Sequence, residues 1–217
     1  MIVDLNLQNK TIVVVGGGNE AQKRINSLLK QECKIIVISN KVTPNIIKLS
    51  KTKKIILKKQ KISDTKFISK LKPNLIITTT DDKKINQKII NDAKKKNIIA
   101  YSSDNPDDSD FSNPAVIDFE NMIQIAIFTG GKSPIMSKKI KDRSEKLFKK
   151  IITKEDIAQI KIQKTARKIA KETIPTPEQR RECLRSIMSD NEIDQLIKDG
   201  QAKKAEKRAI TILRNWK

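Results

Sequence analysis

The sequence contains no histidine, only two cysteines and few aromatic residues. Because Cys33 and Cys183 lie far apart and no histidine is present, the usual zinc, haem and Cys/His-nucleophile sites are excluded. We therefore predict no metal site and expect both cysteines to be small, inert thiols. Aromatic residues make up 3% of the chain, which provides no row of stacking platforms for single-stranded nucleic acid.

Long apolar runs are also missing. No stretch approaches the ~18 apolar residues that a membrane-spanning helix needs, so we expect neither membrane insertion nor export. At 217 residues and 37% hydrophobic residues, the chain can still bury a real core. A folded cytoplasmic protein is the expected class.

Positive charge is present in excess, with a formal net charge of +21. Clustered lysine and arginine would suit nucleic-acid phosphates. The surplus is instead spread over both halves of the chain, and acidic residues interrupt it in the C-terminal half. We thus expect a polyanionic small molecule, and not nucleic acid, as the partner.

The N-terminal half alternates short apolar runs with amphipathic stretches. A β-branched run at 11–15 is followed by three glycines, an amphipathic helix and a second apolar run at 35–38, which is a βαβ pattern. Pro44 is placed to begin the next helix. The sequence predicts an α/β, Rossmann-like, doubly wound parallel sheet. Further strands are expected at 54–58, 75–78 and 98–101, and helices near 64–71 and 82–95.

The glycine turn and Ala21 fit the G-x-G-x-x-G/A pattern of dinucleotide sites. Its first glycine permits the turn, its second lets the diphosphate approach closely, and the helix N-terminus attracts the anion. The second strand ends without the acidic residue that usually holds the adenosine ribose, so Asn40 would serve there, and Lys41 would tolerate a 2′-phosphate. NAD and NADP both stay open from these residues alone. The predicted cofactor-binding residues are Gly16, Gly17, Gly18, Asn19, Glu20, Asn40, Lys41 and Thr80.

The pattern changes after the last strand. Residues 102–110 are acidic and rich in turn formers, and we expect a loop with neither helix nor central strand. Two apolar stretches at 115–119 and 122–128 suggest an antiparallel hairpin, followed by a helix from Ser133 to about Lys150. The remainder is expected to be helical, with breaks at 175–177, near 189–190 and at Gly200. Predicted helix N-caps are Asp81 or Asp82, Ser133, and Ser189 or Asp190.

Several motifs occur together and in order. They are Gly16-Gly17-Gly18-x-x-Ala21-x-Lys23-Arg24, Thr80-Asp81-Asp82-x-x-x-Asn86, Asp104-x-Pro106, Asp110-Phe111-x-x-Pro114-Ala115 and Thr129-Gly130-Gly131-Lys132-Ser133-Pro134. With them the chain resembles precorrin-2 dehydrogenase, the module also found within siroheme synthases. The resemblance implies NAD-dependent oxidation of precorrin-2 to sirohydrochlorin, in some members followed by ferrous-iron insertion. It also implies a homodimer in which the hairpin region is exchanged between subunits.

The resemblance assigns roles to individual residues. It makes Asp104 the general base beside the cofactor, and also the proton acceptor if iron is inserted, since dehydrogenation must release a proton with the hydride. It makes Thr129 a contact of the tetrapyrrole, with Gly130, Lys132 and Ser133 at a helix start where a substrate carboxylate could bind. Ser133 followed by proline is equally a simple helix cap. Precorrin-2 carries eight carboxylates, which suits a basic chain.

With that resemblance, the expected domains are an NAD-binding Rossmann domain at 1–113, a dimerisation hairpin and helix at 114–150, and a helical domain at 151–217. Two other functions remain open. The chain could be an NAD(H)-sensing regulator whose basic helical tail binds DNA, or a cofactor-free chelatase that retains the fold. The intact glycine turn disfavours the chelatase, and the interrupted charge of the tail disfavours the regulator.

Overall fold

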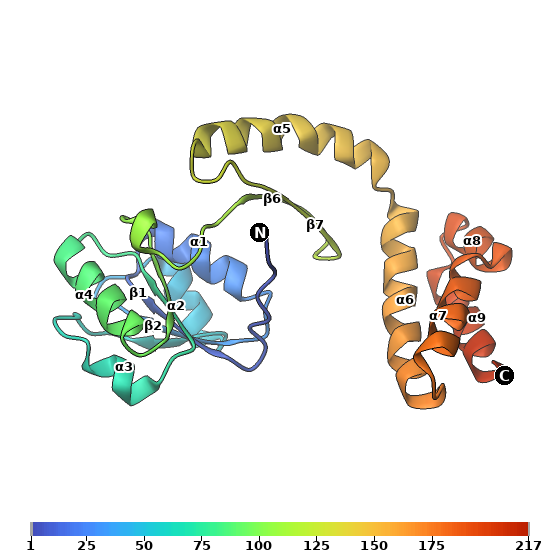
Figure 1. Ribbon diagram of the computed structural model, residues 1–217, viewed down its shortest axis with the longest axis horizontal. Helices are drawn as coiled ribbons and strands as arrows, with labels where there is room; N and C mark the ends of the chain where they lie inside the picture. Colours follow the sequence, from blue (N-terminus) through green and yellow to red (C-terminus); the bar gives the residue numbers. More distant parts are fainter. Residues whose placement is uncertain (1, 217) are drawn as a thin grey trace. The chain divides into compact units, whose positions relative to one another are not determined.

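The structure, a computed structural model, describes residues 2–216 and divides into two compact units, Met1–Asn113 and Pro114–Lys217. The first unit alternates strands with helices (Figure 1). Its strands are β1 (Thr11–Val15), β2 (Lys34–Ile38), β3 (Ile56–Lys58), β4 (Leu75–Thr78) and β5 (Ile99–Ser102). Its helices are α1 (Asn19–Leu28), α2 (Pro44–Lys51), α3 (Lys66–Leu71), α4 (Lys83–Lys94) and the 3₁₀ turn η1 (Pro106–Asp108).

The five strands form one parallel sheet in the order β3-β2-β1-β4-β5. β1 lies in the middle, where Val15 is level with Ile38 of β2 on one side and with Thr78 of β4 on the other. The chain leaves β1 toward β2 and later returns to the opposite side at β4. This reversal opens a crevice outside the carboxyl ends of β1 and β4, which is the usual ligand site of such sheets.

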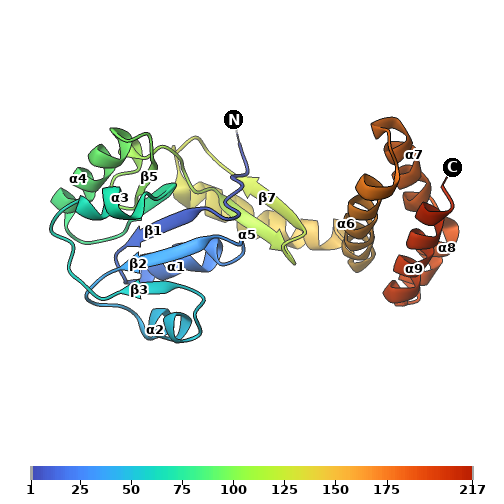
Figure 2. The same ribbon diagram turned by 90° about the horizontal axis from the view of Figure 1, so that it is seen from below.

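Helices cover both faces of the sheet, because alternate residues of the central strands point to opposite faces. Ile12 and Val14 pack with buried side chains of α1 and α2 in one apolar cluster. Val13 and Val15 pack with α3 and α4 in a second cluster on the other face. Figure 2 shows the two helical layers on either side of the strands. The predicted doubly wound α/β fold is confirmed.

The second unit begins with a hairpin and continues as helices. β6 (Ala115–Phe119) and β7 (Ile123–Ile127) pair antiparallel through a turn in which Glu120 and Asn121 both have positive φ. Residues 120–122 separate the last paired residues, Phe119 and Ile123, so the hairpin has a three-residue connection. The helices are α5 (Pro134–Ile151), α6 (Lys154–Thr173), α7 (Pro177–Met188), α8 (Asn191–Lys198) and α9 (Ala202–Arg214), and α6 to α9 enclose a core of their own.

Several local predictions are confirmed and others need correction. Asp82, Ser133 and Asp190 cap α4, α5 and α8 as expected. Ser189 is instead the C-terminal cap of α7, because its backbone N–H completes that helix by donating to Arg185. The expectation of no helix in 102–110 was wrong for one turn, η1, which a proline at its first position initiates. β3 begins two residues later than predicted, at Ile56.

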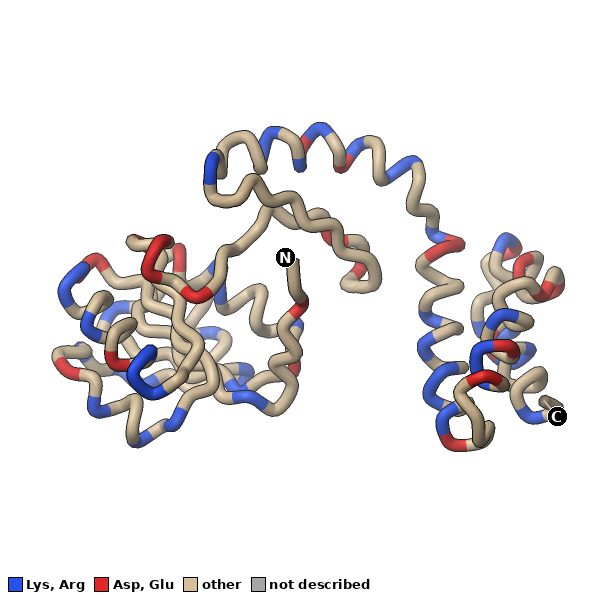
Figure 3. Tube along the Cα trace, in the orientation of Figure 1, with Lys and Arg blue, Asp and Glu red and all other residues tan. Residues whose placement is uncertain are grey.

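Basic residues are distributed over both units, with acidic residues between them, as the colours along the Cα trace in Figure 3 show. No helix within residues 2–216 is long and apolar enough to cross a membrane.

Candidate functional site

A pocket of about 530 Å³ opens at the carboxyl ends of β1, β2 and β4. Gly16, Gly17 and Gly18 form its floor between β1 and α1. Six of the eight residues predicted to bind the cofactor line it, namely the three glycines, Asn40, Lys41 and Thr80. Asn19 and Glu20 are not among the lining residues. The remaining lining residues are Val15, Ile38, Ser39, Val42, Thr43, Gln60, Lys61, Ile62, Thr79, Asp81, Asp82 and Ile85.

The three glycines serve different needs. A Cβ on Gly16, whose φ is +120°, would overlap Thr79 Oγ1, and one on Gly17 would overlap the carbonyl oxygen of Lys41. These two glycines are therefore required for packing against the neighbouring loops. A Cβ on Gly18 would meet nothing within 4 Å. Gly18 is the N-cap of α1 and has no side chain that could accept from the first-turn N–H groups, which leaves those groups available to an anion such as a diphosphate.

The loop after β2 is pinned against the glycine turn. The hydroxyl of Ser39 donates to the carbonyl of Lys41 at 2.6 Å, and the N–H of Thr43 donates to the carbonyl of Gly17 at 3.0 Å. Thr43 also caps α2 and donates its hydroxyl to Gln22 of α1 at 3.0 Å. No acidic residue follows β2, so Asn40 is the polar side chain at the ribose position.

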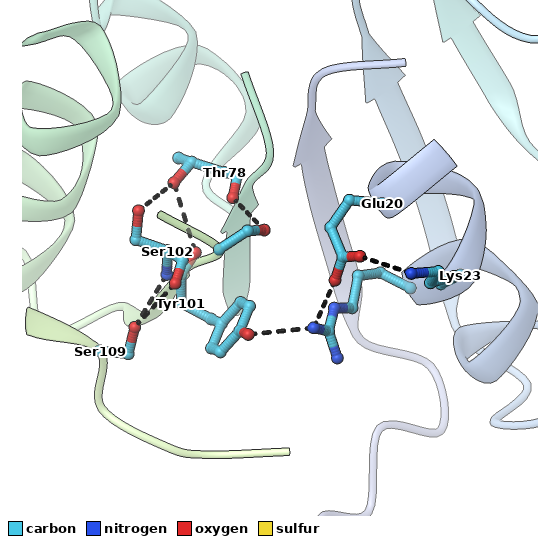
Figure 4. A network of polar contacts seen from close by, with 8 residues as sticks. Glu20, Lys23, Thr78, Tyr101, Ser102 and Ser109 are labelled. Atoms are coloured by element: carbon cyan, nitrogen blue, oxygen red, sulfur yellow. Dashed lines mark hydrogen bonds and ion pairs between the residues drawn. The ribbon is translucent and has the colours of Figure 1, made fainter. Parts of the chain in front are cut away.

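Glu20 points to its own helix. Its carboxylate accepts from Arg24 at 2.5 Å and from Lys23 at 3.3 Å (Figure 4). Burial acts to raise the pKa of Glu20, but the two cations outweigh it and hold that pKa below its ordinary value. The Glu20 side chain therefore orients Arg24 and does not line the pocket.

Arg24 links α1 to the last strand of the sheet. Its guanidinium donates to the Tyr101 hydroxyl at 3.0 Å and lies over the tyrosine ring, 4.9 Å from the ring centre. The Tyr101 ring also packs on Phe111, with 5.1 Å between ring centres. Because Tyr101 precedes Ser102 on β5, these contacts fix the strand end from which the Asp104 loop departs.

Asp104 is held at the end of β5 by two donors. Ser102 Oγ lies 2.6 Å and Asn86 Nδ2 lies 2.9 Å from the same carboxylate oxygen, Oδ1. Ser102 is fixed in turn by the buried hydroxyl of Thr78 at 3.0 Å (Figure 4). The side chain of Asp104 is nevertheless exposed, and Oδ2 takes part in neither bond. The carboxylate is thus oriented with one oxygen available to accept a proton.

Asn86 connects Asp104 with the pocket. It is 1% exposed, and its Oδ1 accepts from the Thr80 hydroxyl at 2.6 Å while its amide donates to the Thr80 carbonyl at 2.8 Å. Thr80 lines the dinucleotide pocket. A single buried amide therefore joins the pocket wall to the candidate base.

The candidate substrate residues lie in the second unit at the start of α5. The hydroxyl of Thr129 accepts from the backbone N–H of Ser133 at 3.1 Å and lies 3.1 Å from the hydroxyl of Ser137. Ser133 caps α5, Gly130 has a φ of +65°, and Lys132 is exposed. Thr129 and Ser133 thus shape the helix N-terminus, and their contact with substrate stays a prediction.

Both cysteines are poorly reactive. Burial raises the pKa of Cys33 and of Cys183, which disfavours the thiolate. Within residues 2–216 no three Cys, Asp or Glu side chains gather where they could hold a metal ion.

Two parts of the site were not predicted from the sequence. Lys61 and its neighbours reach the pocket because β3 runs beside β2 and both strands end at the same edge. Ser102 and Asn86 reach Asp104 from different elements. Lys61 could have been predicted as a pocket residue, since it belongs to a polar segment that directly follows a short predicted strand. No local sequence pattern predicted the hydrogen bonds that Ser102 and Asn86 form with Asp104.

A family model and several known proteins are similar to this chain. The NAD(P)-binding family model matches residues 3–115, about half of the chain. The siroheme synthase of Psychromonas ingrahamii is 29% identical over 201 residues, covering 92% of this chain and 40% of that protein. The siroheme synthase of Ruthia magnifica subsp. Calyptogena magnifica is 32% identical over 143 residues, covering 65% of this chain and 29% of that protein.

A solved structure has the same fold over nearly its whole length. It is SirC, a precorrin-2 dehydrogenase, with a TM-score of 0.69 and 20% identity, covering 97% of this chain and 99% of that one. At this identity the likeness shows the fold alone. The chain spans less than half the length of the siroheme synthases it matches, 40% and 29% in the two cases above.

Proposed function

We propose that this chain, which belongs to the precorrin-2 dehydrogenase and siroheme synthase family of NAD(P)-binding proteins, oxidises precorrin-2 to sirohydrochlorin with NAD. One observation carries the proposal. Asn86 joins Thr80, in the wall of the dinucleotide pocket, to the oriented carboxylate of Asp104. A hydride acceptor and a proton acceptor would therefore meet at one edge of the sheet.

The pocket fits a dinucleotide. Gly18, the N-cap of α1, has no side chain to occupy the first-turn N–H groups, which would hold the diphosphate. Asn40 would bind the adenosine ribose at the end of β2. When bound, NAD supplies the ring that takes up the hydride lost by the macrocycle.

Asp104 would take the proton. Its Oδ1 is occupied by two donors, so Oδ2 is the oxygen that would meet substrate. Because Asn86 and Ser102 fix the carboxylate before substrate arrives, little reorganisation is needed when the proton moves. Asn86, Ser102 and Thr78 are positioning residues in this scheme.

The start of α5 would bind part of the substrate. The exposed Lys132 and the N-terminus of α5 supply positive charge suited to a carboxylate of precorrin-2. The excess of lysine and arginine over acidic residues would also attract a substrate with several carboxylates. The predicted insertion of ferrous iron at the same site rests on the resemblance and on Asp104 alone.

A homodimer would cover an apolar stripe on α5. Met136, Ile140, Leu147 and Ile151 share one face of this helix, because steps of four and seven residues return to nearly the same side. Three of these side chains are 41%, 57% and 59% exposed, in the order Met136, Leu147 and Ile151. Such a stripe is costly in water, and a second copy would bury it. The homodimer and the cytoplasmic location stay predictions.

The direct test uses the full chain, precorrin-2 and NAD, with the absorbance of sirohydrochlorin followed over time. We expect product to form at the rate at which NADH appears. A chain that binds NAD but leaves precorrin-2 unchanged would contradict the proposal. The same assay with sirohydrochlorin and ferrous iron, without NAD, tests chelation separately. None of the relatives named above supports the alternative of a DNA-binding regulator. Specific binding of duplex DNA by this chain would be the evidence for that alternative.

A further inference from the structure

We propose that a groove along α6 is a second binding site for the tetrapyrrole, which it would hold through the carboxylates of that molecule. The inference rests on the proposed substrate, precorrin-2, and adds to Asp104 and the start of α5 a site made of other residues. The groove consists of two adjoining pockets in the second unit, which share Gln163, Arg167 and Lys171 as lining residues.

The groove lies between α6 and two neighbouring elements. One pocket, of about 430 Å³, is lined by α6 and α7, and the other, of about 740 Å³, by α6 and the turn between β6 and β7. The hydrogen bond from Gln163 Nε2 to the carbonyl of Leu184, at 3.1 Å, joins α6 to α7. The ion pair between Lys161 and Glu120, at 2.8 Å, joins α6 to the turn. Both walls are thus attached to α6, and the volumes are those of small-molecule sites.

The lining of the groove is basic. Two helices contribute the lysines and arginines, which are Lys164, Arg167, Lys168 and Lys171 of α6, and Arg180, Arg181 and Arg185 of α7. Among the described residues, no aspartate or glutamate lines either pocket. Half of the eight arginines in the chain line the smaller pocket. The planar guanidinium of arginine matches a carboxylate with two parallel hydrogen bonds.

Most of these cations have no partner within residues 2–216. Arg181 pairs with Glu178 at 2.9 Å, and Arg180 donates to the backbone carbonyls of Pro175 and Thr176 at 2.9 and 3.2 Å. The side chains of the other basic residues of the groove form neither an ion pair nor a hydrogen bond there, and all of them are exposed. Their N–H groups are therefore available to a ligand.

The cations on α6 also repel one another. Lys164 and Lys168 are four residues apart, as are Arg167 and Lys171, and like charges at this spacing on a helix are destabilising. Figure 3 shows basic residues following one another along the second half of this helix. Glu172, the acidic residue in that half, forms no ion pair within residues 2–216. A bound polyanion would relieve the repulsion.

A tetrapyrrole with several carboxylates matches the groove better than a nucleic acid does. Met122 and Ile160 in the larger pocket and Leu184 in the smaller one offer apolar contacts to a macrocycle, and the cations of the same pockets would meet its carboxylates. No aromatic residue lines the groove within the described chain, so the bases of a single strand would have no stacking partner. The groove would hold precorrin-2 before oxidation or sirohydrochlorin after it.

The test titrates uroporphyrin, a stable tetrapyrrole with eight carboxylates, into the full chain and follows its fluorescence. We expect two binding sites per chain, with the affinity of the groove falling as salt is added. Arg167→Glu combined with Lys171→Glu should weaken one of the two sites by about tenfold or more. Arg167→Gln combined with Lys171→Gln should weaken the same site by a smaller factor, and circular dichroism checks that both variants are folded. In both, kcat for precorrin-2 oxidation at saturating substrate should stay within about twofold of the unaltered chain.

Lys204→Glu combined with Lys207→Glu on α9 is the matched control, because it makes the same change in net charge at exposed residues that do not line the groove. It should leave both sites unchanged. Equal weakening in the control and in the Arg167 and Lys171 variant would overturn the inference, as would a single site in the unaltered chain. Tighter binding of duplex DNA than of uroporphyrin through Arg167 and Lys171 would assign the groove to nucleic acid and overturn it too.

The oxidation assay separates this inference from the proposed function. A loss of kcat in the Arg167 and Lys171 variant would make the groove part of the active site and overturn its assignment as a second site. A chain with two uroporphyrin sites that does not oxidise precorrin-2 would contradict the proposed function and leave the second site standing.

Discussion

Asn86 donates one side-chain N–H to Oδ1 of Asp104 at 2.9 Å and another to the carbonyl of Thr80 at 2.8 Å. A buried amide on α4 therefore sets the position of an exposed carboxylate on a different loop. A substitution of Asn86 should therefore alter the positions of both Thr80, in the pocket wall, and Asp104, the candidate base.

Asp104→Asn tests the base directly. Asparagine keeps an Oδ1 acceptor for Asn86 and Ser102, but its amide nitrogen cannot accept a proton. We expect kcat for precorrin-2 oxidation to fall by about 10²-fold to 10⁴-fold, with an unchanged dissociation constant for NAD. Steady-state kinetics and calorimetry check the two quantities. Asp107→Asn in η1 is the control, and equal losses in both variants would refute the role of Asp104.

Asn86→Ala tests the positioning role. Removing the amide leaves the Thr80 carbonyl and Asp104 Oδ1 each short of a donor, which should lower the free energy of unfolding by about 1–3 kcal/mol. We expect kcat to fall while KM for precorrin-2 changes little. Chemical denaturation and kinetics measure both effects. Lys88→Ala, an exposed change on the same helix, should alter neither; an unchanged kcat in Asn86→Ala would exclude the positioning role.

Gly17→Ala should destabilise the first unit, because its Cβ would overlap the carbonyl oxygen of Lys41 and lie 2.6 Å from Val42 Cγ1. The loop must shift to relieve this overlap, at about 1–3 kcal/mol. Gly18→Ala is the matched comparison, since its Cβ meets nothing within 4 Å. It should change the free energy of unfolding by less than about 0.5 kcal/mol. The affinity for NAD should fall instead. Urea denaturation that ranks the two variants in the opposite order would contradict this explanation.

Glu20 should make the stability depend on pH. Its folded-state pKa is lowered below the ordinary 4.5, so its carboxylate favours folding above that pH and the benefit is lost as pH falls through the folded value. Glu20→Gln should therefore be less stable than the unaltered chain at neutral pH, and the two should converge as the solution is acidified well below 4.5. Urea denaturation across this range measures the difference. Glu172→Gln, which removes an exposed carboxylate without an ion pair within residues 2–216, should show a smaller effect at neutral pH.

Leu147→Glu tests the dimer. A carboxylate in the middle of the α5 stripe would be buried by a second copy, so we expect monomers in solution by light scattering coupled to size exclusion. Lys138→Glu places the same side chain nine residues earlier on α5, about half a turn around the axis at ~100° per residue. It should leave the dimer intact. If the unaltered chain is already monomeric, the exchange of hairpins is refuted.

Much of the first unit could be predicted from the sequence because its signals are local. The β-branched run of β1, the glycines after it and the amphipathic α1 each follow from neighbouring residues, and together they place Gly16 and Gly18 in the pocket. Caps such as Asp82 and Asp190 were predictable for the same reason, since each acts within three residues. The sequence could not decide whether Ser189 or Asp190 caps α8, because both residue types can cap a helix.

The rest depends on contacts between distant segments. Arg24 reaches Tyr101 across 77 positions, and Asn86 reaches Asp104 across 18. No periodicity encodes which polar side chain a folded sheet will bring next to another. The role of Glu20 was also hidden, because only the structure shows that its carboxylate faces Arg24 and Lys23.

The bond between Thr43 and Gly17 brings the beginnings of α1 and α2 to the same pocket. The N-caps of two helices, Gly18 of α1 and Thr43 of α2, thus line one pocket, and each stands at the positive end of its helix dipole. Unlike lysine or histidine, these dipoles carry no proton to lose. The backbone contribution to holding a diphosphate should therefore be the same in acidic and alkaline solution, and a pH profile of dinucleotide affinity will report on titrating side chains and on the dinucleotide itself.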